Sequence, residues 1–161
     1  MAKSKKIVVK YLVYESVDEL DSMRQKLVDK AKKAGKNAYA PYSNFHVGAA
    51  VRLENGEIIL GNNQENAAFP SGLCAERVAI FAAHANYPNE KITHLAITSE
   101  GDFIDKNAIL SPCGACRQVL VESSQRQKNP FEVILLNPDA SVLVFDDARD
   151  LMPLIFDGST E

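Results

Sequence analysis

The chain has 161 residues, of which 46% are hydrophobic and 24% are charged, and its formal net charge is -3. A chain of this length can bury about two-thirds of its unfolded surface, so we expect one domain over residues 1–161, in which residues 1–15 could form an N-terminal extension. The weakly acidic charge argues against a nucleic-acid partner, because proteins that bind nucleic acid usually carry a basic stripe.

No stretch of the sequence reaches the roughly 18 consecutive apolar residues that a membrane-spanning helix needs. The apolar run at residues 7–9 is interrupted by Lys10 before it could serve as the core of a signal peptide. We therefore expect a cytoplasmic protein with no membrane association. Thiols stay reduced in that compartment, so the three cysteines favour a metal site over disulfides.

The first part of the chain predicts a strand and a helix. Residues 7–14 are rich in β-branched and aromatic side chains and could form a short strand, or a tail that orders against a neighbour. Ser16 and Glu19 have the spacing of a capping box, in which each side chain satisfies a free backbone N–H. Apolar residues then recur at helical spacing, which predicts a helix from about residue 20 to Gly35.

A β-hairpin is predicted next, after a polar and aromatic loop. Residues 45–53 have the composition of a strand, Asn55-Gly56 is the strongest short hairpin signal, and residues 57–60 form the returning strand. Gly48 and the two alanines that follow it indicate that another element packs closely on the first strand. We expect that element to be a helix.

The second half of the chain alternates between helices and strands. The predicted elements are a helix from 75 to about 86, a strand at 92–99, a helix from 113 to about 122, strands at 131–136 and 142–145, and a last helix at 148–154. Residues 101–110 are a loop between two of these elements. This order predicts an α/β fold, a three-layer α/β/α sandwich with a mixed sheet of about five strands.

All three cysteines lie where helices are expected to begin. Cys74 follows the helix-breaking residues 70–72, and Cys113 and Cys116 lie on the first turn of the later helix. The positive ends of two helix dipoles would lower the cysteine pKa values and offset the charge of the thiolates. We therefore expect a Zn²⁺ ion held by Cys74, Cys113 and Cys116 between two helix N-termini.

The number of ligands favours chemistry over a structural role. A structural zinc site normally closes with four protein ligands, whereas a catalytic site keeps one position for water. The three histidines lack ligand spacing to the cysteines, so the fourth position is free, and Glu76 adds a further negative charge close to the thiolates. Arg77 and Arg117 directly follow motif residues and could donate hydrogen bonds to the sulfurs.

Cys-Ala-Glu-Arg at residues 74–77 and Pro-Cys-Gly-Ala-Cys-Arg-Gln at residues 112–118 closely resemble the small, three-cysteine cytidine deaminases of pyrimidine salvage. The resemblance extends from about Leu20 to Phe156. It implies a single deaminase domain with one Zn²⁺ per chain and Glu76 as the proton shuttle. The implied reaction is hydrolytic deamination of cytidine and 2′-deoxycytidine to uridine and 2′-deoxyuridine by zinc-activated water, with release of ammonia.

The resemblance also implies how a small nucleoside substrate is bound. Phe45 matches the aromatic residue that lies against the base, and Asn63 and Glu65 match the pair that binds the ribose hydroxyls. The backbone N–H of Ala75 corresponds to the donor to the pyrimidine carbonyl, and the carbonyl of Ser111 to the acceptor from the 4-amino group. An amide beside a carboxylate supplies the donors and acceptors that ribose hydroxyls need.

Members of the family are typically homotetramers whose sites include residues of neighbouring subunits. Ala67, Phe69 and Phe156 fall on such positions in this sequence. Phe69 departs from the tyrosine often found there, so a contact made through that hydroxyl is not expected.

Three alternatives remain open from the sequence. The same scaffold could deaminate another small aminopyrimidine or an antibiotic nucleoside, although Asn63 and Glu65 favour a free ribose. A polynucleotide-editing enzyme is disfavoured, because no basic groove studded with aromatic residues is apparent. A structural zinc module is disfavoured by the missing fourth ligand and by the placement of Glu76.

Overall fold

The computed structural model describes residues 2–101 and 103–158. Three α-helices lie in this part of the chain: α1 (Ser22–Gly35), α2 (Ala75–Asn86) and α3 (Gly114–Gln127). The strands are β1 (Leu12–Tyr14), β2 (His46–Leu53), β3 (Ile58–Asn62), β4 (Ile92–Glu100), β5 (Glu132–Leu136) and β6 (Val142–Phe145). Short 3₁₀ turns are η1 (Val17–Glu19), η2 (Phe69–Ser71) and η3 (Ala148–Leu151).

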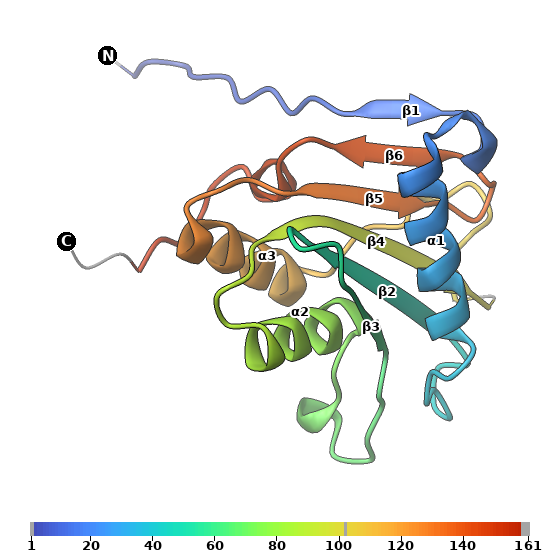
Figure 1. Ribbon diagram of the computed structural model, residues 1–161. Coiled ribbons are helices and arrows are strands. Elements are labelled where there is room, and N and C mark those ends of the chain that lie inside the picture. Colours follow the sequence, from blue (N-terminus) through green and yellow to red (C-terminus); the bar gives the residue numbers. More distant parts are fainter. Residues whose placement is uncertain (1, 102, 159–161) are drawn as a thin grey trace.

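The described strands form one six-stranded sheet in the order β1-β6-β5-β4-β2-β3. Strands β4 and β5 run parallel, and the other neighbouring strands are antiparallel. Helix α1 covers one face of the sheet, and α2 and α3 cover the other (Figure 1). The predicted α/β fold with a mixed sheet is confirmed, with six strands in place of about five.

Successive side chains of β2 belong in turn to the hydrophobic cores on the two faces of the sheet. Val47, Ala49 and Val51 belong to the core beneath α2 and α3, whereas Ala50 belongs to the core beneath α1. Successive side chains of a strand point to opposite faces of the sheet, so a strand that is buried on both sides reads as a continuous apolar run.

Two glycines allow helices to approach the sheet closely. A Cβ on Gly48 would lie 1.9 Å from the carbonyl oxygen of Ala31 in α1, which confirms that a helix packs on this strand. A Cβ on Gly61 in β3 would lie 2.4 Å from the carbonyl oxygen of Ala75 and 2.5 Å from the backbone nitrogen of Ala79. The absence of a side chain at Gly61 therefore sets the position of the N-terminal turn of α2.

The entry into α1 differs from the predicted capping box. Ser16 caps the short turn η1, and the carboxylate of Glu19 accepts from the backbone N–H of Glu15, not from that of Ser16. Leu20 is extended and separates this turn from the α-helix. The helix begins at Ser22, where Asp21 accepts from the backbone N–H groups of the first turn.

Other boundaries also differ from the sequence prediction. The predicted strand at residues 7–14 is confirmed only for Leu12–Tyr14, which pairs with β6 at the edge of the sheet. Helix α3 continues to Gln127, and the predicted last helix is the 3₁₀ turn η3. None of the helices in the described ranges is both long and apolar enough to cross a membrane.

Candidate metal centre and active-site cavity

The three thiols meet between two helix N-termini. Cys74 is the N-cap of α2, Cys113 is the N-cap of α3, and Cys116 lies in the first turn of α3. The sulfur atoms of Cys74 and Cys113 are 4.0 Å apart, those of Cys113 and Cys116 are 3.5 Å apart, and all three lie within 4.8 Å of one another. The sequence prediction that these cysteines converge is therefore confirmed.

The sulfur spacing fits a zinc ion. Tetrahedral coordination with Zn–S bonds of about 2.3 Å places neighbouring sulfurs about 3.8 Å apart. The separations of 3.5 and 4.0 Å bracket that value. The three cysteines would thus hold one Zn²⁺, and Cys74 and Cys113 both line the adjoining cavity.

The thiols perturb one another strongly. Hydrogen bonding to Cys116, together with the neighbouring Arg77 guanidinium, lowers the pKa of Cys74 to about 5. The same interaction with Cys74, followed by burial, raises the pKa of Cys116. Close sulfurs resist ionising together because their charges repel. A divalent cation is the charge that lets all three act as thiolates, and the two helix N-termini add to its effect.

The two arginines of the motifs have different partners. The Nη2 atom of Arg77 lies 3.7 Å from the sulfur of Cys74 and 3.4 Å from the carbonyl oxygen of Gly72, so this side chain donates to a ligand as expected. Arg117 instead donates to the carbonyl oxygens of Pro112 and Leu151, both at 2.9 Å, and to the Ser111 hydroxyl at 2.7 Å. Its guanidinium holds the segment before Cys113 in place, and the hydrogen bonds that it makes to the described residues go to these oxygens and not to a sulfur.

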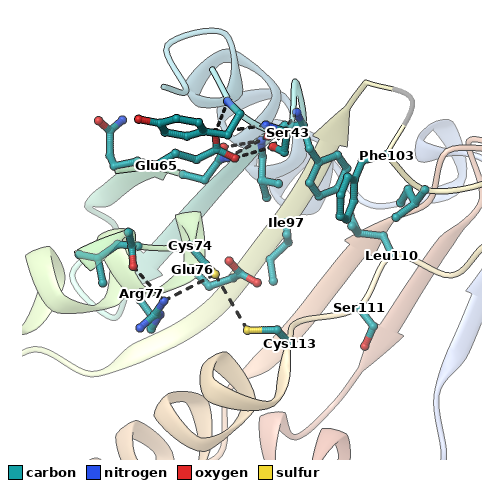
Figure 2. A pocket seen from close by; sticks show the side chains of 18 of the residues that line it. Ser43, Glu65, Cys74, Glu76, Arg77, Ile97, Phe103, Leu110, Ser111 and Cys113 are labelled. Atoms are coloured by element: carbon teal, nitrogen blue, oxygen red, sulfur yellow. Dashed lines mark hydrogen bonds between the residues drawn. The ribbon is translucent and has the colours of Figure 1, made fainter. Parts of the chain in front are cut away.

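Glu76 stands in the first turn of α2, beside the thiols (Figure 2). Only 5% of its surface is exposed, and it lines the cavity together with Cys74 and Cys113. Burial, followed by the negative charge of Cys74, raises the pKa of Glu76 to about 7. A carboxyl group whose pKa lies near neutrality can both accept and return a proton at physiological pH.

A cavity of about 580 Å³ opens in front of the thiols and Glu76. This volume lies within the range of about 300–1,000 Å³ that is typical of small-molecule sites. Its apolar wall includes Phe45, Val47, Ile97 and Leu110, and its polar residues include Ser43, Asn63, Glu65 and Ser111. Figure 2 shows Glu65 and Ser43 on the side of the cavity away from Ser111 and Cys113.

The predicted ribose-binding pair is held by the backbone around it. The amide oxygen of Asn63 accepts from the backbone N–H of Val47 at 2.8 Å, and its Nδ2 atom donates to the carbonyl oxygen of Phe45 at 2.8 Å. One N–H and one lone pair of this amide remain for a ligand. The Glu65 carboxylate accepts from the Ser43 hydroxyl and from the backbone N–H of Tyr42, and these bonds lower its pKa.

The other residues predicted for the site differ in whether they line the cavity. Ala75 is fully buried in the first turn of α2, and Ser111 lines the cavity. Phe69 lies at the cavity wall, packs edge-on against Tyr42 and is 74% exposed. Phe156 is also 74% exposed, and Ala67 is exposed, but neither lines the cavity of its own chain.

Sequence reasoning missed the contribution of the loop between β4 and α3. Phe103, Ile104 and Ile109 line the cavity, and the ring of Phe103 lies against that of Phe45 with centroids 5.2 Å apart. The signal in the sequence was the presence of several apolar side chains in one predicted loop, because apolar side chains that gather at a surface often mark a binding groove.

A three-thiol centre with a buried carboxylate beside it, on an α/β scaffold, defines a zinc-dependent hydrolytic enzyme. Residues 21–129 match the family model for the cytidine and deoxycytidylate deaminase zinc-binding region. The chain therefore belongs to the cytidine deaminase family.

Curated relatives and solved structures agree with this assignment. A cytidine deaminase from Halalkalibacterium halodurans is 40% identical over 99 residues, which span 62% of this chain and 70% of the relative. A probable cytidine deaminase from Dictyostelium discoideum is 35% identical over 133 residues, 82% of each chain. The crystal structure of cytidine deaminase from Burkholderia pseudomallei superimposes with a TM-score of 0.67 at 38% identity, covering 81% of this chain and 97% of that one. The structure from Mycobacterium tuberculosis gives 0.64 at 31% identity, covering 85% and 99%.

Proposed function

We propose that this chain catalyses the hydrolytic deamination of cytidine and 2′-deoxycytidine to uridine and 2′-deoxyuridine, with release of ammonia. The observation that carries the proposal is the convergence of three thiols and the buried Glu76 at one cavity. The related proteins named above are cytidine deaminases, which supports the same reaction here. The resemblance to pyrimidine-salvage enzymes supports a cytoplasmic location.

Cys74, Cys113 and Cys116 would hold the zinc ion, and the positive charge of Arg77 would partly offset the negative charge of the Cys74 sulfur. When bound, Zn²⁺ would lower the pKa of a water molecule and supply hydroxide at neutral pH. Glu76 would accept the proton released from that water and pass it to N3 of the pyrimidine. A carbon–oxygen bond would form at C4. Glu76 would then take the proton of the new C4 hydroxyl and deliver it to the 4-amino group, so that the carbon–nitrogen bond breaks, ammonia leaves and the C4 carbonyl of uridine remains.

The cavity residues would orient the nucleoside for this attack. Phe45 would lie against the base, and the free donor and acceptor of Asn63, with the Glu65 carboxylate, would bind the ribose hydroxyls. The backbone N–H of Ala75 would donate to the pyrimidine carbonyl, and the carbonyl of Ser111 would accept from the 4-amino group. Such fixed donors and acceptors would keep C4 within reach of the attacking oxygen.

Charge in the cavity favours an unphosphorylated substrate. Among the described residues that line it, Arg77 is the one cation, and it already donates to Cys74 and Gly72. A 5′-phosphate would add about two negative charges beside Glu65 without a cation to pair with them. Another small aminopyrimidine nucleoside, including an antibiotic one, is the alternative that this charge pattern also allows.

We also propose that the chain is a single deaminase domain that assembles as a homotetramer. The exposed rings of Phe69 and Phe156 and the exposed Ala67 support a role for these residues in the site of a neighbouring subunit. Large exposed apolar groups near a site are typical of protein–protein contacts. The placement of all six described strands in one sheet supports the single domain.

Turnover and metal content together test the function. Cytidine, 2′-deoxycytidine, cytidine 5′-monophosphate and cytosine are each mixed with the zinc-loaded protein, and conversion is followed by ultraviolet absorbance. We expect turnover of the two nucleosides and little of the other compounds. Glu76→Gln should keep one zinc per chain and lose about 10²–10⁴-fold in kcat, whereas Glu57→Gln in the exposed hairpin should match the wild type. Uridine production at the wild-type rate by Glu76→Gln, or full activity of a zinc-free protein, would contradict the assignment.

A further inference from the structure

The loop that joins β4 to α3 places an aromatic ring at the cavity although it belongs to none of the predicted site motifs. Phe103 lines the cavity and is 67% exposed. Ile104 and Leu110 from the same loop also line the cavity, so the loop forms part of its apolar wall (Figure 2). The ring is therefore of interest for its place in the cavity wall and not for its exposure.

The start of the loop brings Phe103 to this place. Gly101 has a φ of +119°, a conformation that favours glycine, and a Cβ there would lie 2.4 Å from the carbonyl oxygen of Asn44. The loop therefore leaves β4 in direct contact with the segment that carries Phe45. At its other end, the backbone N–H of Leu110 donates to the Asn137 side chain at 2.8 Å, in a buried hydrogen bond.

The contact between the two rings is specific. The centroids of Phe45 and Phe103 are 5.2 Å apart with an interplanar angle of 34°, within the range in which aromatic pairs attract. Phe45 is half-buried and packs on the core beneath α2 and α3. Phe103 therefore restrains one side of the ring that is expected to contact the base, and the core restrains another.

We propose that Phe103 is a positioning residue for substrate binding, which acts by fixing the ring of Phe45 against the pyrimidine. This inference rests on the proposed function. It assigns Phe103 a role in ground-state affinity, because the ring lies on the apolar wall and presents no group that could move a proton or bind the metal. Removing it should raise KM and leave kcat nearly unchanged.

Steady-state kinetics of Phe103→Ala with cytidine tests the inference. We expect KM to rise about two- to tenfold, which corresponds to the interaction free energy of one aromatic pair. We expect kcat to stay within about twofold of the wild-type value. Phe103→Tyr keeps the aromatic ring and should have the wild-type KM. Phe103→Leu should have a KM between those of the wild type and Phe103→Ala. Tyr11→Ala is the matched control, because Tyr11 stacks on Phe145 in similar geometry, with centroids 5.1 Å apart at 30°, in the N-terminal segment beside β1. It should leave KM unchanged.

A double-mutant cycle shows whether Phe103 acts through Phe45. In a Phe45→Ala background, Phe103→Ala should raise KM no further. Full additivity of the two changes, an unchanged KM in Phe103→Ala, or a loss of kcat alone would each overturn the inference. Those results all require that the wild-type protein deaminates cytidine, so a failure of the proposed function, seen as a wild type without turnover, is recognised separately.

Discussion

Replacing Gly61 by alanine tests whether the seating of α2 on β3 sets the geometry of the metal centre. The new Cβ would lie 2.4 Å from the carbonyl oxygen of Ala75, and ordinary contact begins at 3.4 Å, so the helix or the strand must move by about 1.0 Å. Either movement displaces part of the site, because Cys74 caps α2, Glu76 lies in its first turn, and β3 leads directly to Asn63.

The size of that displacement predicts a large functional effect. Metal ligands tolerate about 0.2 Å, and a misplacement of about 1 Å in an active site can cost about a hundredfold in rate. We therefore expect Gly61→Ala to lose about a hundredfold in kcat/KM and to bind zinc less tightly, while overpacking lowers the free energy of unfolding by about 1–3 kcal/mol. The assays are cytidine turnover, zinc per chain after dialysis, and urea unfolding.

Gly48→Ala provides the comparison on the other face of the sheet. Its Cβ would lie 1.9 Å from the carbonyl oxygen of Ala31, so the loss of stability should be at least as large. Neither α1 nor β2 carries a metal ligand, so the zinc content per folded chain should match that of the wild type. Wild-type zinc content and kcat/KM in Gly61→Ala would refute the idea that this contact positions the site.

Two further predictions concern stability. Arg24→Ala should lower the free energy of unfolding by about 2–3 kcal/mol, because Arg24 makes a two-bond ion pair with the buried Glu132, whereas Arg149→Ala in an exposed pair should cost less than about 1 kcal/mol in the same urea titration. Burial lowers the pKa of His94 from 6.5, so the unfolded chain binds the proton more readily and stability should fall as the pH drops through 6.5. Urea midpoints at pH 7.5 and 5.5 should differ less in His94→Gln than in the wild type, and equal differences would contradict this reasoning.

The metal ligands were predictable from sequence because their arrangement is local. Helix-breaking residues before Cys74 and before Cys113 mark where the two helices begin, and Cys116 follows within the first turn. Helix geometry alone then directs the sulfurs beyond the helix ends. Asn63 and Glu65 lie in a segment that reads as a turn from its residues alone, and only the family resemblance identified them.

Features that depend on distant partners were missed. The strand signal at residues 7–14 overestimated β1, because β6 offers only Val142–Phe145 for pairing. The course of the loop with Phe103 depends on the contact between Leu110 and Asn137, which lie 27 residues apart. The sequence around Leu110 does not indicate that Asn137 is its partner. In the same way, the sequence around Arg117 does not indicate that the carbonyl of Leu151 accepts its hydrogen bond.

The gathering of every cysteine in one centre has a practical consequence. The chain has three cysteines, and all of them lie in the cluster beside Glu76. Maleimides, iodoacetamide or a fluorescent thiol probe would compete with zinc for the same sulfurs and act as inactivators. Dyes or surface attachments are better directed to amines such as Lys32 and Lys33, which are exposed on the helix across the sheet from that centre.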